Sequence, residues 1–262
     1  MKTTIQQKMA WYLPVFAVLF WLSGCATTPA TDPRDPWEGW NRGVQSFNDG
    51  ADDYVIKPVA EGYQWITPSF VDQGVTNFFN NIGDITVTIN DLLQFKFGQG
   101  SEDFTRFLIN TTLGVVGLVD VGTMLEFERH NEDFGQTLGA WGVPTGPYLV
   151  LPLLGPSSPR ETFGLVGDAA TNPLFYINFP AVTWSLTTLR FVDLRADLLS
   201  ASRIVEEAAL DRYEFFRNAY LQRRDYLVHD GNPPIEDEEI LDEDLDEDLK
   251  LEEEPEGKPL QE

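Results

Sequence analysis

Apolar residues recur every three or four positions along most of this chain, which is the spacing of one face of an α-helix. This spacing predicts helical faces over Trp37–Phe47 and Phe70–Ile82. Ser101 is a residue type that caps helix N-termini, and acidic residues follow it in what would be the first turn of another helix. The polar run at 110–112 predicts the end of that helix.

The window Ile85–Ile89 is rich in β-branched residues and fits a strand as well as a helix. Because apolar positions continue at helical spacing into Leu92 and Leu93, we interpret the whole stretch as helix. The ranges 192–209 and 211–228 show the same spacing and predict the last two helices. No stretch shows a long strand-like alternation, so the sequence predicts an all-α fold.

Two apolar segments rich in glycine and proline interrupt this helical pattern. They span 114–125 and 146–155, and both are too short to cross a membrane. In the second, Pro147 and Pro152 block a continuous helix. Loops this apolar are expected to be buried or to contact something apolar, and a bilayer is one candidate.

The N-terminus has the three parts of a secretory signal peptide. Two lysines precede a short apolar run, and small residues follow it within residues 1–24. Leu22-Ser23-Gly24-Cys25 resembles the bacterial lipobox, in which Cys25 is lipidated and becomes the mature N-terminus. Cys25 is the single cysteine of the chain. The alternative is an ordinary signal peptide with an accidental cysteine. In the lipobox interpretation, residues 25–36 form a lipidated tether.

The lipobox resemblance also predicts the membrane to which the lipoprotein is sorted. The residue after Cys25 is Ala26 and not the aspartate associated with inner-membrane retention in many Gram-negative bacteria. By that resemblance the lipoprotein is expected in the outer membrane.

The net charge excludes nucleic acid as a partner, and its distribution along the chain distinguishes the C-terminal segment from the rest. The chain has 18 basic and 42 acidic residues, a net charge of −24, which excludes a nucleic-acid binder that works through basic patches. About half of this charge lies at the end, where 235–262 holds 15 acids and two lysines. We interpret 232–262 as a disordered acidic tail. An acidic helix that docks a partner through Leu241, Leu245 and Leu249 is the alternative.

Catalytic chemistry has little support in the sequence. A serine hydrolase would need His130 or His229 as its base, and no G-x-S-x-G elbow is present. Both histidines lie in polar connections typical of solvated loops, and no Cys/His spacing suits a metal. The G-x-x-x-G at Gly135–Gly139 leaves two interpretations open: close helix approach in a membrane, or a short soluble helix with two small residues.

Several blocks of sequence resemble, in order, those of the MlaA (VacJ) lipoproteins. The resemblance covers roughly Asp35–Gly231, together with the lipobox. The blocks are Asp35–Asp49, Lys57–Ala60, Phe104–Thr111, Gly117–Val121, Phe134–Gly139, Gly142–Pro152 and Ala219–Asp225.

This resemblance implies a fold and a function. MlaA proteins are all-α, ring-like single domains of amphipathic helices that lie in the outer membrane, here expected over 37–231. Their central channel removes phospholipid mislocalised in the outer leaflet and passes it to the periplasmic carrier MlaC, and they associate with trimeric porins. No enzyme activity and no cofactor beyond the covalent lipid are implied. The alternative is a structural lipoprotein that scaffolds porins without moving lipid.

The resemblance also places the candidate channel residues. The mobile hairpin of the family falls on Gly146–Gly155, where the gate candidates are Pro147, Tyr148, Pro152 and Gly155. A plain buried loop is the alternative there. A second candidate region near the channel mouth is Asn41–Asn48, represented by Asn41, Arg42 and Asn48, for which the alternative is packing of the first helix.

Overall fold

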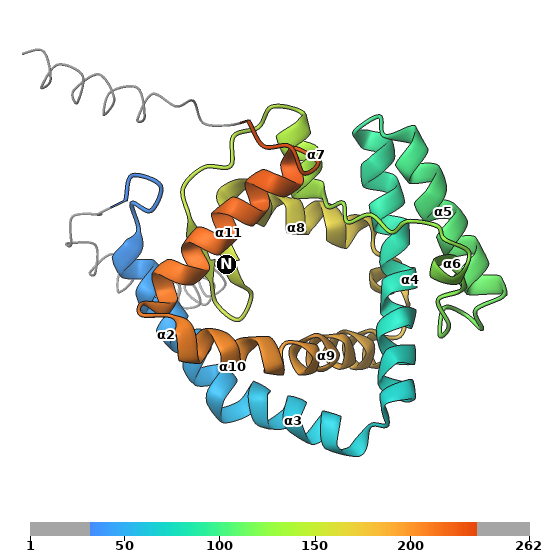
Figure 1. The fold of residues 1–262 in the computed structure, drawn as a ribbon, viewed down its shortest axis with the longest axis horizontal. Coiled ribbons are helices and arrows are strands. Elements are labelled where there is room, and N and C mark those ends of the chain that lie inside the picture. Colours follow the sequence, from blue (N-terminus) through green and yellow to red (C-terminus); the bar gives the residue numbers. More distant parts are fainter. Residues whose placement is uncertain (1–31, 235–262) are drawn as a thin grey trace, which may run out of the picture.

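A computed structural model describes residues 32–234, and Figure 1 shows its helices following one another around a ring. The predicted signal peptide, Cys25 and the acidic segment from 235 onward lie outside the described residues. The elements are α2 (Glu38–Ala51), π-helix η2 (Asp52–Ile56), α3 (Lys57–Ile66), α4 (Ser69–Leu93), α5 (Phe97–Thr112), α6 (Val121–Met124), α7 (Phe134–Ala140), β1 (Leu149–Leu151), β2 (Gly155–Ser157), α8 (Pro159–Thr171), 3₁₀ helix η3 (Pro173–Tyr176), α9 (Pro180–Asp197), α10 (Leu199–Ala208) and α11 (Arg212–Val228).

The ring is built from helices that pack on their sequence neighbours and on distant partners. Figure 1 shows α4 forming one side, with α5 and α6 against its outer face. Helix α3 packs beside α9, while α7 contacts both α8 and α11. The last helix, α11, returns to the beginning of α2, so the two ends of the described chain lie on the same side of the ring (Figure 1).

Glycines allow the closest of these helix contacts. A Cβ on Gly164 of α8 would lie 2.6 Å from the Gly135 nitrogen of α7. A Cβ on Gly100 of α5 would lie 3.1 Å from the Cβ of Asp91 in α4. The G-x-x-x-G spacing at Gly135–Gly139 therefore serves close packing of α7 inside the protein.

The helices bury polar residues and expose large apolar ones. Helix α4 buries Asp84, Asn90 and Asp91, whereas its Phe70 is 76% exposed. Two small apolar clusters, around Tyr148 and around Ala196, hold most of the buried apolar side chains of the described residues, and Phe79, Val87 and Leu174 are buried outside them. A globular protein in water usually shows the opposite distribution, so the outer surface is suited to an apolar environment.

Several predictions of secondary structure are confirmed and others are wrong. Residues 85–89 lie within α4, and α5 ends at Thr112, as predicted. The N-cap prediction for Ser101 is wrong, because α5 begins at Phe97 and the Ser101 hydroxyl donates a hydrogen bond to the Gly98 carbonyl instead. The predicted helix over 192–209 is two helices, since α9 begins at Pro180, which suits a first helical turn, and the chain breaks at Leu198.

Two further outcomes concern the segment 146–155 and the start of the folded domain. The segment 146–155, which its apolar pattern suggested to be a loop, overlaps the hairpin that the family resemblance implied there, because Leu149–Leu151 pairs antiparallel with Gly155–Ser157. The all-α prediction holds apart from this two-stranded hairpin. The predicted tether reached Pro36, but Asp35 is 0% exposed and belongs to the folded domain. Its buried polar contacts, described below, hold it there.

The buried Asp91 predicts a pH dependence of stability. Neither of its carboxylate oxygens has a hydrogen-bond partner among the described residues. Burial, followed by the charges of Asp103 and Glu132, raises the pKa of Asp91 from 3.8 to about 7. A carboxyl whose pKa is higher in the folded state stabilises the fold fully below its unfolded pKa, and this contribution is lost as pH rises through the folded pKa.

We therefore expect the wild type to lose thermal stability relative to Asp91→Asn as pH rises from about 4 to about 7. Thermal melts of the full chain across that window measure the difference. Substitution of the exposed Asp53 by Asn is the matched control and should leave the slope unchanged. Equal slopes for wild type and Asp91→Asn would contradict the assignment.

Candidate functional site

An open cavity of about 550 Å³ lies inside the ring. Its walls come from α4, α8, η3, α9 and α11 and from the connection that leads into α7. Helices from opposite sides of Figure 1 thus face the same space. The walls combine apolar side chains, Val87, Leu165, Phe175 and Leu227, with charged and amide side chains, Arg129, Asn131, Glu132, Asp133, Gln136, Asp168, Asn172, Arg190, Arg223 and Arg224.

Ion pairs hold several of the charged wall residues in place. Arg129 Nε lies 3.2 Å from Asp84 Oδ1, and burial raises the pKa of Asp84 to about 6 despite this pairing. Arg224 donates to Asp133 at 2.6 Å and also pairs with Glu161. Burial raises the pKa of Asp133, but hydrogen bonds and charge from Arg224 outweigh it and hold the pKa below its ordinary value.

The hairpin is fixed to α2 by two asparagines. Asn41 and Asn48 lie two helical turns apart and so share one face of α2. The Asn41 amide donates to the Tyr148 carbonyl at 3.0 Å and accepts from the Val150 N–H at 2.8 Å. The Asn48 amide donates to the Leu151 carbonyl at 3.0 Å and accepts from the Leu153 N–H at 2.7 Å. Each side-chain amide therefore pairs with β1 as another strand would.

The hairpin tip stands between two smaller cavities. One, of about 210 Å³, continues from the main cavity, with which it shares four residues, Asp133, Leu165, Asp168 and Arg224. The other, of about 290 Å³, lies against α2, η2, α9 and α10. Leu154 and Pro156 line both. The backbone is left-handed at Leu153 (φ 62°) and at Gly155 (φ 80°), which makes the turn.

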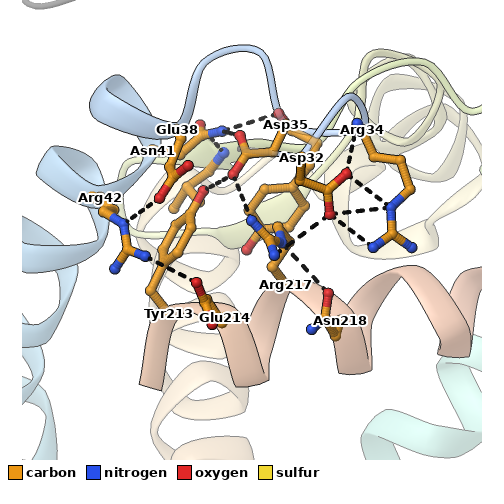
Figure 2. Close-up of polar contacts among 12 residues, drawn as sticks. Asp32, Arg34, Asp35, Glu38, Asn41, Arg42, Tyr213, Glu214, Arg217 and Asn218 are labelled. Carbon is orange, nitrogen blue, oxygen red and sulfur yellow. Dashed lines mark hydrogen bonds and ion pairs between the residues drawn. The ribbon is translucent and has the colours of Figure 1, made fainter. Parts of the chain in front are cut away.

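A buried carboxylate joins the hairpin region to the last helix, as Figure 2 shows. Asp35 accepts a hydrogen bond from the Tyr213 hydroxyl and another, of 2.8 Å, from Asn41 Nδ2. Arg217 of α11 approaches the same carboxylate at 3.5 Å. The ring of Tyr148 meets that of Tyr213 edge-on, 6.0 Å between centroids. We call Asp35, Asn41, Tyr213 and Arg217 the closing cluster.

Known proteins resemble this chain in sequence over most of its length. The sequence profile described as MlaA lipoprotein matches residues 33–227. The chain belongs to the MlaA lipoprotein family. A relative from Escherichia coli (strain K12), named intermembrane phospholipid transport system lipoprotein MlaA, is 35% identical over 80% of this chain and 85% of its own length. A relative of the same name from Haemophilus influenzae is 33% identical over 86% of this chain and 92% of its own length.

A solved structure agrees in fold. It is described as "Structural basis for maintenance of bacterial outer membrane lipid asymmetry" and superposes with a TM-score of 0.66. It is 32% identical in sequence and covers 74% of this chain and 98% of its own. The predicted family and all-α fold class are therefore confirmed.

The structure separates the predicted channel residues into two groups. Asn48 and Gly155 line the 290 Å³ cavity, and Asn41 holds the strand beside it. Arg42 instead pairs with Asp211 at 2.9 Å and lies 4.3 Å above the ring of Tyr213. Tyr148 is buried in the apolar cluster, Pro147 is half-buried and Pro152 is exposed. Cys25 lies outside the described residues.

Sequence reasoning missed the residues that build the cavity walls. Neither the wall residues Arg129 and Arg190 nor Asp84, the buried partner of Arg129, stands out in the sequence, because each looks like an ordinary polar position when only its neighbours in the chain are considered. One signal was available for Asp84, which falls within a mostly apolar helical stretch. His130 was predicted to be solvated, but its Nδ1 lies 2.9 Å from the buried Asp103.

The two hairpin asparagines give a paired prediction. Asn41→Ala leaves the buried Val150 N–H and Asp35 carboxylate each short of one partner, so it should destabilise the fold by about 2–4 kcal/mol. Asn48 is half-buried, so water can replace much of its hydrogen bonding and Asn48→Ala should have the smaller effect.

Chemical unfolding and amide hydrogen exchange measure these effects. Exchange should rise at Val150 in the first variant and chiefly at Leu153 in the second. Each variant serves as the control for the other. Unchanged protection at both amides would refute the role given to the asparagines.

Proposed function

We propose that this chain is an outer-membrane lipoprotein that removes mislocalised phospholipid from the outer leaflet and passes it to a periplasmic carrier. The E. coli and H. influenzae relatives carry the name of an intermembrane phospholipid transport system. One observation supports the proposal above the others. A cavity with both charged and apolar walls lies inside a ring whose outer surface exposes large apolar side chains.

The mixed cavity suits the chemistry of a phospholipid. Such a molecule has a charged head and two apolar tails, so its path needs polar and apolar walls together. Moving it breaks no covalent bond and needs no nucleophile. The connection before α7, together with α8, α9 and α11, supplies the charged part, and Leu165, Phe175 and Leu227 supply the apolar part.

The outer surface suits a bilayer. Trp65 is 88% exposed and Trp184 is 71% exposed, and tryptophan favours the membrane–water interface. The apolar connection between α5 and α6 exposes Leu113, Val115 and Val116. Among residues 32–234 no helix has the length and apolarity needed to cross a membrane. We therefore propose that the ring lies within one membrane and that a lipid on Cys25 anchors it.

The hairpin is proposed as the gate of this path. Its tip separates the two smaller cavities, and the exposed Leu153 and Leu154 need little displacement of other side chains to move. Asn48 holds both β1 and the Leu153 N–H at the start of the turn, while the side chains of Leu153 and Leu154 stay exposed. The partners proposed for the membrane-embedded ring are the periplasmic carrier MlaC and a trimeric porin.

Outer-leaflet phospholipid in a deletion strain tests the function. We expect the deletion to expose phospholipid on the cell surface, the full chain to restore asymmetry, and Cys25→Ala to restore little of it, because the ring is no longer delivered to the outer membrane. Surface labelling of phosphatidylethanolamine measures the effect. Normal asymmetry in the deletion strain, accompanied by altered porin levels, would favour the scaffolding function instead.

Substitution at the hairpin turn tests the gate. Gly155 has φ 80°, and no atom lies within 4 Å of the position that a Cβ would take there, so Gly155→Val strains only the backbone of the turn. Gly142 has φ 87° and equally open surroundings, but lies outside the hairpin, which makes Gly142→Val a matched control.

At equal protein levels, we expect Gly155→Val to raise outer-leaflet phospholipid severalfold and Gly142→Val to leave it near the wild-type level. Surface labelling in the complemented deletion strain provides the measurement. Equal asymmetry in the two variants would rule out the gate.

A further inference from the structure

Arg190 differs from the other charged side chains of the main cavity. It lies on α9, is half-buried and lines the 550 Å³ space. None of the described residues forms an ion pair or a side-chain hydrogen bond with its guanidinium. Burial, followed by the charge of Arg129, lowers the pKa of Arg190 from its ordinary value. A second arginine, Arg129, lines the same cavity.

The carboxylates of the cavity wall are already engaged. Glu132 lies 2.9 Å from Lys96, and Asp133 lies 2.6 Å from Arg224. Asp168 accepts hydrogen bonds from the Phe134 N–H at 2.9 Å and from the Asn90 amide at 3.3 Å. These contacts leave no wall carboxylate paired with Arg190 among the described residues.

Two further arginines border the same space. Arg129 has one carboxylate partner, Asp84, at 3.2 Å. Arg223 of α11 lines the cavity, is exposed and has no ion-pair partner within residues 32–234. Among the described residues, the guanidinium of Arg129 therefore has one carboxylate partner, and those of Arg190 and Arg223 have none. The wall has four arginines against the three acids Glu132, Asp133 and Asp168, which leaves one positive charge, and Asp84 balances this charge through Arg129. The positive charge without a local carboxylate partner among the described residues is therefore on Arg190 and Arg223.

An uncompensated guanidinium in a partly desolvated cavity is unfavourable, and an anion that enters relieves it. Guanidinium groups form charge-assisted, often bidentate hydrogen bonds with phosphate oxygens. The apolar Leu165, Phe175 and Leu227 line the same space, so a ligand that carries both a phosphate and hydrocarbon fits these walls better than a free ion does.

We propose that Arg190, with Arg129 and Arg223, binds the phosphodiester of a phospholipid in transit through the ring. This inference rests on the proposed function and adds to it a specific headgroup site. The site suits a passing ligand, because Asp84 offsets part of the charge of Arg129 and Arg223 remains open to water. A path needs binding that is weak enough to allow release.

Binding of short-chain lipids tests the site. The full lipoprotein in a non-ionic detergent is dialysed against dihexanoyl-phosphatidylglycerol, against dihexanoylglycerol, which lacks the phosphate, and against inorganic phosphate, with empty-micelle background subtracted. We expect Arg190→Ala to weaken phosphatidylglycerol binding about tenfold and to leave dihexanoylglycerol binding unchanged. Arg190→Lys should keep part of the affinity. Arg203→Ala, an exposed arginine on neighbouring α10, is the matched control and should bind as the wild type does.

Each outcome decides the inference. Equal phosphatidylglycerol binding by Arg190→Ala and wild type overturns it. Inorganic phosphate that binds as tightly as the phospholipid assigns the arginines to a free anion and also overturns it. Unchanged dihexanoylglycerol binding shows that a variant is folded, and Arg190→Lys replaces Arg190→Ala if the latter is not.

The same variants in the deletion strain separate this inference from the proposed function. If the wild type restores lipid asymmetry and Arg190→Ala restores it equally well, the arginine site is wrong while the transport function stands. If the deletion strain shows normal asymmetry, the transport function fails, and the dialysis result still reports on the phosphate site.

Discussion

The closing cluster around Asp35 is the interaction on which the arrangement of the ring depends. One buried carboxylate accepts hydrogen bonds from Tyr213 of α11 and from Asn41 of α2. Asn41 then pairs with the backbone of β1. The beginning of the described chain, the hairpin and the last helix thus meet at one point, as Figure 2 shows. Because a buried carboxylate is costly without partners, the three segments hold one another in a single arrangement.

This arrangement decides where the hairpin tip lies. Once Asn41 and Asn48 fix β1 to α2, the short turn at 152–154 can reach only the space between the two smaller cavities. The tip carries apolar side chains and no second layer of packing. The proposed gate is thus a hairpin whose first strand and turn backbone are held by α2, while the side chains of Leu153 and Leu154 remain exposed.

The polarity of the ring connects its fold to its proposed function. Several polar side chains of α4 are buried and bond to other elements, as Asp84 does to Arg129 and Asn90 to Asp168, while large apolar side chains such as Phe70 are exposed. Such a molecule gains its stability from inward hydrogen bonds and from an apolar surrounding medium together. The charged walls of the cavity come from the connection before α7 and from α8, α9 and α11, and it is these walls that we propose hold a phospholipid headgroup.

Local sequence patterns predicted which segments are helical better than they predicted where each helix begins and ends. The helical spacing that continues to Leu92 placed 85–89 in a helix correctly, because burial of one face outweighs the strand preference of β-branched residues. Ser101 suggested a start that is wrong, because its hydroxyl binds a carbonyl within a helix that already exists. The residue pattern did not predict the two strands of the hairpin, which only the family resemblance placed on Gly146–Gly155, since each strand has three residues and its pairing depends on α2.

The family, the lipobox with its single cysteine and the acidic tail could be inferred from the sequence alone, because ordered motifs and charge runs are local properties of a chain. The tertiary structure alone decided which charges are paired. Asp84 and Arg129 are 45 positions apart, and Asp133 and Arg224 are 91 positions apart, yet each pair is in contact. That Arg190 has no carboxylate partner among the described residues can be seen only once these pairings are known. Whether a charge is satisfied depends on neighbours in space, and the order of residues along the chain does not contain that information.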